Sequence, residues 1–342
     1  MRAILDTAAW LVVLAGISLA GTFAAHRYAL WRDLLDHPGE RRSHGVATPR
    51  GGGVGIVIAL LAAMGVLAFR DHAQAIGMAL AATGLLLVAG IGWLDDHRPL
   101  TPWSRLAVHA IASCLLAVVA FRAGGHLAPA LFAFALAMVL VNIWNFMDGI
   151  DGIASLQALV VAIGCALLAN DVPARWLSLA LGAACAGFLP MNLPRARIFL
   201  GDVGSGALGY LLALAMMLAA IGEGRATSPS TWMLLLLPAS AFLLDASLTL
   251  GSRIVRGERW WTPHVGHAYQ RWARRLGSHQ PVTFAYAAWA IAGCVLALAS
   301  QDRAGASIMY IGSAWYLWGG ILWLRFQSSC GRRSGLPGKQ SE

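Results

Sequence analysis

The feature that most constrains this chain is a series of apolar stretches, each close to the length needed to cross a bilayer. Roughly 20 apolar helical residues span the hydrocarbon layer, and about eleven stretches of the 342 residues approach that length. They lie near residues 8–29, 52–69, 74–94, 104–121, 127–146, 153–169, 175–190, 205–221, 231–252, 282–300 and 306–325. The chain is 58% hydrophobic and 12% charged, whereas soluble domains are about half apolar and about a quarter charged. The sequence therefore predicts an all-α integral membrane protein with about eleven transmembrane helices.

The polar intervals between these stretches are too short to hold a soluble domain. We therefore expect residues 1–325 to form one polytopic membrane domain and residues 326–342 to form a disordered cytoplasmic tail. The first stretch is long and lacks a convincing basic leader, so we interpret it as a retained span and not as a signal peptide. The five Cys residues show no paired or metal-ligating spacing and are expected to be inert thiols.

The positions of Lys and Arg predict the orientation, because cytoplasmic loops are enriched in both. With the N-terminus outside, 19 of the 25 Lys and Arg residues fall on the inner side and 6 on the outer side. The sequence therefore predicts an outside N-terminus and a cytoplasmic C-terminus. The net charge of +9 comes from residues that border membrane helices, where they meet anionic lipids and substrates, so it does not indicate nucleic-acid binding.

Five polar motifs fall on this predicted cytoplasmic side, at the ends of apolar stretches. They are DHPGERRSHGVATPRGGG (36–53), GWLDDHRPL (92–100), NFMDGIDG (145–152), FLGDVGSG (199–206) and TPHVGHAYQR (262–271). A transporter tends to place ionisable residues near the bilayer midplane. Acids gathered at one interface instead favour an enzyme that joins a water-soluble substrate to a lipid head group.

The carboxylates in these motifs indicate the chemistry. They are Asp95, Asp96, Asp148, Asp151 and Asp202. The segment 141–154 has two Asn and two Asp but no Lys or Arg, so we interpret its acids as uncompensated. If the carboxylates converge, their repulsion requires a cation, and oxygen ligands favour Mg²⁺ or Mn²⁺, which commonly bridge phosphates. Free N–H groups at the start of GDVGSG are expected to cradle an anion, and Arg and His side chains of other loops to hold a diphosphate. The combination predicts metal-assisted phosphoryl transfer.

Each motif also has a purely structural interpretation. Asp95 and Asp96 could form a solvated helix end, and the other acids could cap helices. Asn residues of the 141–154 segment could hydrogen-bond between helices, and the two His of HVGH could be ordinary loop residues. Asp245 lies within an apolar stretch, where a carboxylate is costly. It either pairs with Arg253 or belongs to the site. The coincidence of all the motifs on one face favours the functional interpretation.

DDHRPL, NIWNFMDGIDG and FLGDVGSG, in that order, resemble the polyprenyl-phosphate N-acetylhexosamine-1-phosphate transferases of glycosyltransferase family 4. The resemblance runs from about residue 36 to 275, and the eleven-span topology also matches. It implies transfer of a sugar 1-phosphate from a UDP-N-acetyl sugar to undecaprenyl phosphate, with release of UMP, on the cytoplasmic face of the bacterial inner membrane. A homodimer is compatible with the sequence, which does not determine the oligomeric state.

The resemblance also implies roles for individual residues. Asp95 and Asp96 would be the catalytic acidic pair, with Asn145 and Asp148 in the same polar centre. Asp202 would be the ligand of Mg²⁺, for which Mn²⁺ is an alternative. The remaining candidates would bind substrate: Asp151 and Phe199 beside the uracil, His264 and His267 at phosphate or sugar, together with Asn142 and Arg271.

The last cytoplasmic motif distinguishes branches of the family. The peptidoglycan branch has three adjacent histidines in its last cytoplasmic loop, whereas this chain has HVGHAYQR. That pattern is more similar to the branch that initiates O-antigen and related cell-surface polysaccharides. Two other functional classes are weighed against the enzyme. A transporter of a lipid-linked or ionic substrate is disfavoured by the one-sided acids, and a degenerate scaffold by the presence of every expected acid.

Overall fold

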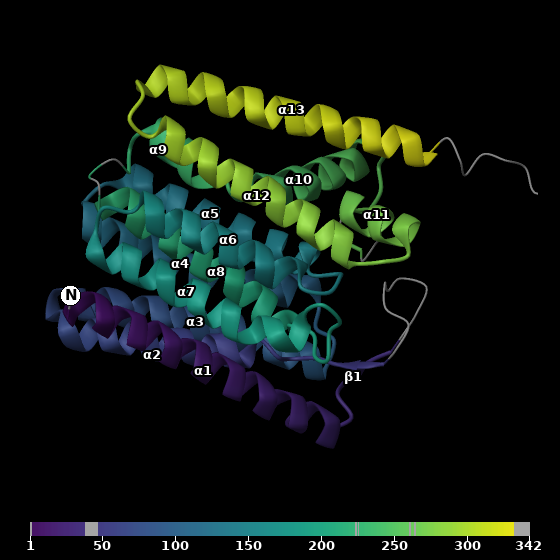
Figure 1. The fold of residues 1–342 in the computed structure, drawn as a ribbon, viewed down its shortest axis with the longest axis horizontal. Helices are drawn as coiled ribbons and strands as arrows, with labels where there is room; N and C mark the ends of the chain where they lie inside the picture. Colours follow the sequence, from purple (N-terminus) through teal and green to yellow (C-terminus); the bar gives the residue numbers. More distant parts are fainter. Residues whose placement is uncertain are drawn as a thin grey trace, which may run out of the picture.

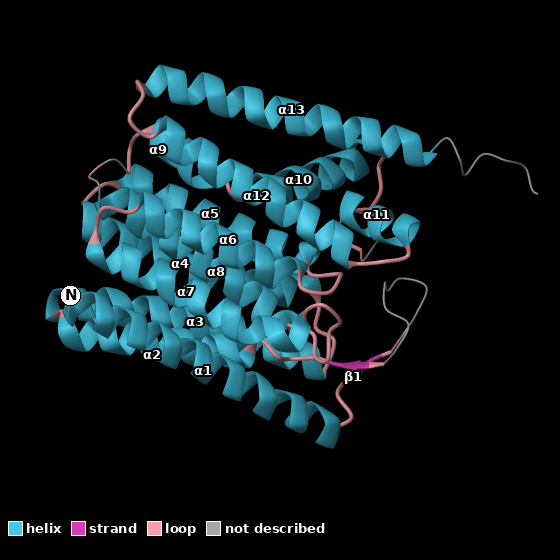
Figure 2. Ribbon diagram, viewed as in Figure 1, coloured by secondary structure: helices cyan, strands magenta, loops and turns pink. Residues whose placement is uncertain are grey.

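The computed structural model describes residues 2–37, 47–222, 224, 226–259, 261–262 and 265–331. Helices make up most of this part of the chain (Figure 2). The α-helices are α1 (Arg2–Trp31), α2 (Val54–Arg70), α3 (Ala75–His97), α4 (Pro102–Gly124), α5 (Leu127–Met147), α6 (Ile153–Leu168), α7 (Val172–Asn192), α8 (Gly201–Gly222), α9 (Pro229–Leu236), α10 (Ser240–Val255), α11 (Ala268–Leu276), α12 (Gln280–Ser300) and α13 (Gly305–Gly331). The short 3₁₀ helix η1 (His72–Gln74) precedes α3. Strands β1 (Leu35–Asp36) and β2 (Thr48–Pro49) form a two-residue antiparallel pair.

Each of the eleven predicted apolar stretches lies on helix, so the all-α membrane class is confirmed apart from the small β pair. Seven helices in the described part are long and apolar enough to cross a membrane, or eight if the bent pair α9–α10 forms one span. The apolar helices α2 and α6 are shorter, at 17 and 16 residues. By this test the structure supports seven or eight spans.

The stretch predicted as one span over 231–252 is broken. α9 and α10 meet at an angle of 94°. Pro238 lies at the break, and its ring and missing N–H prevent a continuous helix. The Pro238 carbonyl accepts a hydrogen bond from Gln157 Nε2 at 3.2 Å, which satisfies a backbone group that lipid could not.

α8 forms the centre of the bundle and is 94% buried across its apolar window. It packs most extensively against α3 and α5, and also contacts α4, α6 and α7 (Figure 1). α13 lies at the outside of the bundle, next to α9 and α10. Because α8 is enclosed by other helices, its first residues are held at a fixed position relative to the ends of α3 and α5.

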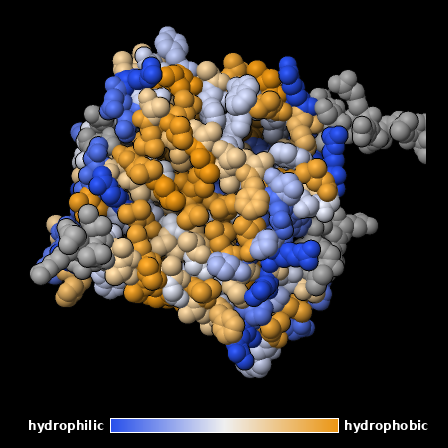
Figure 3. All heavy atoms as spheres, in the orientation of Figure 1, coloured by the Kyte–Doolittle hydropathy of each residue, from blue (hydrophilic) through white to orange (hydrophobic). Residues whose placement is uncertain are grey.

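The surface agrees with a membrane-embedded bundle. An apolar band crosses the middle of the face drawn in Figure 3, and polar residues gather toward the two ends of the helices. The N-terminus lies at one end of the bundle, whereas α11, β1 and the end of α13 lie at the other (Figure 1). α13 continues to Gly331, so the first residues of the predicted tail are helical. Residues 332–342 lie outside the described residues.

A glycine-to-glycine contact joins the segment before α2 to the start of α8. Gly52 and Gly53 donate backbone hydrogen bonds of 2.9 Å to the carbonyls of Phe199 and Leu200. A Cβ atom on Gly53 would lie 2.1 Å from Gly204 Cα. Gly52 and Gly53 are therefore needed for close approach, and their contact fixes FLGDVGSG against the neighbouring loop.

Candidate active site

The C-terminal ends of α3 and α5 and the N-terminal ends of α4 and α8 meet at the same end of the bundle. Their side chains line a cavity of about 370 Å³, whose far wall comes from α10 and the segment leading into α11. Predicted site residues on its wall are Asn142, Asn145, Asp148, Asp202 and His267. The structure therefore brings together motifs that are up to 125 residues apart in the sequence.

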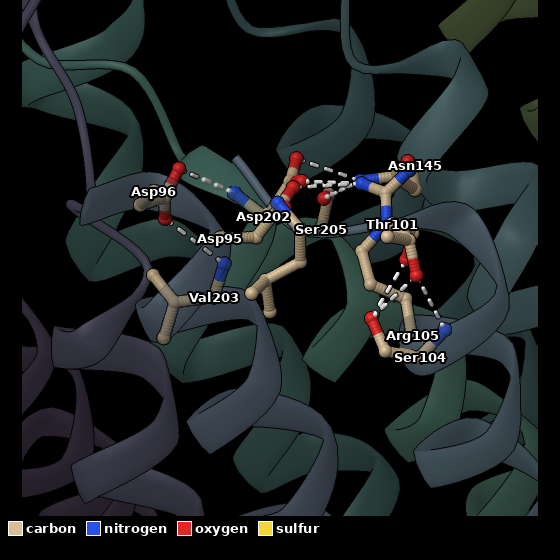
Figure 4. Close-up of polar contacts among 10 residues, drawn as sticks. Asp95, Asp96, Thr101, Ser104, Arg105, Asn145, Asp202, Val203 and Ser205 are labelled. Atoms are coloured by element: carbon tan, nitrogen blue, oxygen red, sulfur yellow. Dashed lines mark hydrogen bonds and ion pairs between the residues drawn. The ribbon is translucent and has the colours of Figure 1, made fainter. Parts of the chain in front are cut away.

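An arginine lies at the centre of the acid cluster. Arg105 Nη1 is 2.8 Å from Asp95 Oδ2 and 2.8 Å from Asp202 Oδ2, so one guanidinium nitrogen bridges two carboxylates (Figure 4). Asn145 Nδ2 donates to Asp202 Oδ1 at 2.8 Å and to Ser205 Oγ at 3.1 Å. A continuous polar network around Asp202 thus joins four helices, namely α3, α4, α5 and α8.

Two of the predicted acids share a cationic partner. α4 places Arg105 ten residues beyond Asp95 and directly between the carboxylates of Asp95 and Asp202, two acids that lie outside the 141–154 segment. Within that segment, Asp151 lies 3.3 Å from His279, and the interpretation of its acids as lacking a Lys or Arg partner stays a prediction. The sequence shows Arg105 only as one basic residue at a helix start. Its partners become visible only when α3, α4 and α8 are packed together.

Asp96 has a different role from its neighbour. Its side chain is 2% exposed, and its two oxygens accept from the backbone N–H groups of Asp202 and Val203 at 3.1 and 3.2 Å (Figure 4). Asp96 therefore caps the N-terminus of α8 from another helix, where a negative charge is favoured by the helix dipole. The expectation that these two N–H groups of GDVGSG are free to cradle an anion is wrong, because Asp96 already accepts from them.

Asp148 follows the last residue of α5 and lines the cavity. Burial, together with the smaller effect of the nearby negative charges of Asp96 and Asp151, raises the pKa of its carboxyl to about 7. A carboxyl with such a pKa changes its charge near neutral pH.

Asp151 and Phe199 lie on a second cavity at the same end of the bundle. This cavity has a volume of about 730 Å³ and is also lined by Arg195, Arg197 and His279. Asp151 forms an ion pair with His279 at 3.3 Å when the imidazole is protonated. The two residues predicted to lie near uracil are thus brought together, but on a different cavity from Asn145 and Asp202.

The last predicted substrate residues are divided. His264 lies outside the described residues. His267 lies between the rings of Phe146 and Tyr269, at centroid distances of 6.4 and 5.8 Å. Burial lowers the pKa of His267, although the nearby Asp245 carboxylate opposes this effect. Arg271 donates to Gln327 of α13 and lines neither of these two cavities.

Several residues that line the two cavities were not singled out from the sequence. Arg105, His109, Trp103, Trp261, Tyr269 and Gln270 line the first cavity, and His279 lines the second. The signal that was available for Arg105 is its position in the first turn after an acidic helix end, on the charged side of the bilayer. The others carry no local pattern that separates them from ordinary core or loop residues.

The oxygen donors at and beside the first cavity suit a hard divalent cation. Asn145 and Asp202 line the cavity, whereas Asp95 lies behind Arg105 and is not on its wall. Asp95, Asp202 and Asn145 offer oxygen ligands of the kind that Mg²⁺ prefers, and a positive group already lies between the two carboxylates. Among the described residues, no group of three or more His, Cys, Asp or Glu side chains is arranged to hold a metal ion. The residues therefore fit a magnesium ion by the chemistry of their oxygen atoms, and Asp202 and Asn145 are the residues that would hold it.

Sequence comparisons identify the family. The model of glycosyl transferase family 4 matches residues 78–220. A decaprenyl-phosphate N-acetylglucosaminephosphotransferase from Mycobacterium tuberculosis is 30% identical over 291 residues, which are 74% of this chain and 72% of that protein. An undecaprenyl-phosphate alpha-N-acetylglucosaminyl 1-phosphate transferase from Thermotoga maritima is 29% identical over 255 residues, covering 73% and 76% of the two chains. The chain belongs to glycosyl transferase family 4.

The branch preference predicted from HVGHAYQR is also confirmed. A phospho-N-acetylmuramoyl-pentapeptide-transferase from Streptococcus mutans is 30% identical, but only over 191 residues, which are 48% of this chain and 56% of that protein. The N-acetylglucosaminyl relatives match nearly three quarters of the chain. This family 4 member is thus a membrane-embedded transferase outside the peptidoglycan branch.

Replacing Arg105 by Gln should destabilise the protein in the absence of divalent cations. The change leaves two neighbouring carboxylates without their shared cation, and we expect a loss of about 1–3 kcal/mol in the free energy of unfolding. Added Mg²⁺ should raise the melting temperature of Arg105→Gln more than that of the wild type, because the ion replaces the lost charge. Arg98→Gln, an exposed change seven residues away, is the control. An equal response of the three proteins to Mg²⁺ would contradict the assignment.

The pH dependence of stability should reveal Asp148. Its pKa is higher in the folded protein, about 7, than the ordinary value of 3.8. The unfolded chain therefore loses this proton at lower pH than the folded protein, and the folded state is destabilised as the pH rises between about 4 and 7. In the presence of a chelator, the melting temperature of the wild type should fall more between pH 5 and 8 than that of Asp148→Asn. Parallel curves for the two proteins would show that Asp148 does not titrate in this range.

Proposed function

We propose that this protein transfers N-acetylglucosamine 1-phosphate from UDP-N-acetylglucosamine to undecaprenyl phosphate and releases UMP. The observation that carries the proposal is the Asp95–Arg105–Asp202 network on a cavity at a helix end. The names of the relatives supply the sugar and the lipid class, since they describe N-acetylglucosaminyl phosphate transfer to decaprenyl or undecaprenyl phosphate. The product would be the first lipid-linked intermediate of a cell-surface polysaccharide of the O-antigen type.

The cavity wall suits two substrates of opposite polarity. Its polar side carries the acid–arginine network, whereas Trp103, Leu106 and Leu250 give it an apolar side. Trp103 is 59% exposed at the start of α4. A lipid phosphate can therefore approach from the bilayer while its isoprenoid chain stays on apolar surface, and a nucleotide sugar can approach from the water phase.

The second cavity provides a place for the nucleotide. Phe199 offers an aromatic face to a base, Asp151 offers acceptors to a pyrimidine N–H, and Arg195 and Arg197 give the cavity positive charge. One short loop, residues 148–152, contributes to both cavities, because Asp148 lines the first and Asp151 lines the second. A UDP-sugar that spans this loop would place its diphosphate at the acid–arginine network.

The reaction would exchange one phosphoanhydride for another. An oxygen of the lipid phosphate attacks the sugar-bearing phosphorus, and the bond to the UMP phosphate breaks, so UMP leaves with that electron pair. Mg²⁺ bound by Asp202 and Asn145 would supply positive charge to the diphosphate. Arg105 is placed to neutralise phosphate oxygens, and Asp95 holds Arg105 while also accepting from Leu100 N–H at 2.6 Å. Since a phosphate monoester is largely ionised near neutral pH, orientation by Asp95 contributes more than proton removal.

The predicted topology completes the proposal. We infer eleven spans, with the N-terminus outside and the active site facing the cytoplasm. The N-terminus and the end of α13 lie at opposite ends of the bundle, which supports an odd number of crossings (Figure 1). All the acid motifs lie at the end where α13 finishes, on the side with most of the Lys and Arg residues.

Purified protein should release UMP from UDP-N-acetylglucosamine only when undecaprenyl phosphate and Mg²⁺ or Mn²⁺ are present. Asp202→Asn should lower kcat by at least about 100-fold, because charge stabilisation at the reacting phosphate is lost. The assay couples UMP release to mass spectrometry of the lipid, which identifies the sugar transferred from a panel of UDP-N-acetyl sugars. UMP release that is complete in excess chelator, or that needs no lipid, would refute the proposal.

Single cysteines in a Cys-free protein should locate the active-site face. A cysteine at exposed Arg98 should react with an impermeant thiol reagent only after the cells are opened. A cysteine at Gly125, in the turn between α4 and α5 at the opposite end, should react in intact cells. The reverse pattern would invert the topology.

A further inference from the structure

The carboxylate of Asp245 is the most densely hydrogen-bonded acid in the described part of the chain. Its side chain, in α10, is 2% exposed. Oδ1 accepts from Ala268 N–H at 2.8 Å, and Oδ2 accepts from Tyr269 N–H at 3.0 Å. Three side chains also donate to it, namely Thr249 Oγ1, Tyr286 OH and Trp323 Nε1, at 3.2, 2.8 and 3.1 Å. Its expected alternative partner, Arg253, instead donates to Glu258 at 2.8 Å.

These five donors come from α10, α11, α12 and α13, so one carboxylate joins four helices. A buried charge is tolerated when its lone pairs are satisfied by hydrogen bonds. The two backbone donors are the first residues of α11, where the helix dipole favours a negative charge. The residue before them, His267, does not cap α11 with its own side chain. Asp245 therefore takes the place of the capping residue, just as Asp96 does for α8.

The helix that Asp245 caps forms a wall of the first cavity. His267, Tyr269 and Gln270 line that cavity, whereas Asp245 is not among its described lining residues. On the other side, Tyr269 OH donates to the Phe146 carbonyl at 3.1 Å, next to the loop that carries Asp148. The first turn of α11 is thus fixed at two points, one on α10 and one on the end of α5.

We propose that Asp245 is a positioning residue for the transferase, which holds the first turn of α11 so that His267, Tyr269 and Gln270 face the reacting groups. Asp245 itself does not touch substrate. Its two bonds to Ala268 and Tyr269 also mean that these N–H groups are not available to bind a phosphate. The kinetic part of the proposal rests on the function proposed above, whereas its structural part does not.

The experiment compares substitutions that each remove a different hydrogen bond of the same carboxylate, that of Asp245. Asp245→Asn weakens the two bonds to α11, because an amide has only one accepting atom in place of two. Tyr286→Phe and Trp323→Phe each remove one other donor to Asp245 and leave the α11 bonds in place. Hydrogen exchange of the Ala268 and Tyr269 amides, the melting temperature, and kcat and KM for both substrates are measured for every protein.

In Asp245→Asn, the two amides should exchange at least about tenfold faster, and kcat should fall at least about tenfold, since hydrogen bonds to a charged acceptor are stronger than bonds to a neutral one. Tyr286→Phe and Trp323→Phe should keep kcat and amide protection within about threefold of the wild type, even where their melting temperatures fall. Across the series, kcat should therefore follow the protection of the α11 amides and not the melting temperature.

Asp245→Glu keeps the negative charge and replaces Asp245→Asn in the experiment if the Asn variant is not produced as folded protein. Its kcat should fall by as much as the protection of the Ala268 and Tyr269 amides falls. Unchanged protection of Ala268 and Tyr269 in Asp245→Asn, or a loss of kcat that follows melting temperature in all variants, would overturn the proposal. If the wild type releases no UMP, the proposed function fails, while the exchange measurement still decides whether Asp245 holds α11.

Discussion

The structure of the end of the bundle that holds the first cavity depends on buried carboxylates, each of which caps a helix other than its own. Asp96 accepts from the first amides of α8, and Asp245 accepts from the first amides of α11. Each bond pair fixes the direction in which a helix begins, and α8 and α11 carry the groups that face the first cavity. The favourable meeting of a negative charge with a helix N-terminus makes these charges tolerable at 2% exposure.

The acid–arginine network is built on that fixed start of α8. With its backbone held by Asp96, the side chain of Asp202 is directed to Arg105 and Asn145 and not to its own helix end. Adjacent residues thus divide two tasks, since Asp95 engages the guanidinium while Asp96 engages the backbone. A like-charge pair at one helix end is stable here because each member has a separate positive partner.

The break between α9 and α10 also determines the structure at this end of the bundle. After Pro238 the chain turns by 94°, and α10 then brings Asp245 and Leu250 towards the first cavity. The carbonyl exposed by the break is satisfied by Gln157 of α6. A straight helix over this stretch would place these residues elsewhere, so the bend is what allows α11 to close one wall of the cavity.

Much of the fold and part of the site follow from local properties of the sequence. The length and composition of the apolar stretches predict the helical membrane class. The placement of charged residues predicts that Asp95, Asn145, Asp148 and Asp202 lie at one end of the bundle. Both predictions are possible because each signal depends only on residues that are close together in the sequence. The motifs were specific enough to predict glycosyl transferase family 4.

The tertiary structure alone decided the partners of these acids: Arg105 between Asp95 and Asp202, Asp96 on α8, Asp245 on α11, and Asp151 on a separate cavity. The reason is physical: a carboxylate is stabilised by whichever cation or N–H group the packing of the helices brings within hydrogen-bonding distance. That choice depends on the order and angles of the helices, which hydropathy and local spacing do not encode.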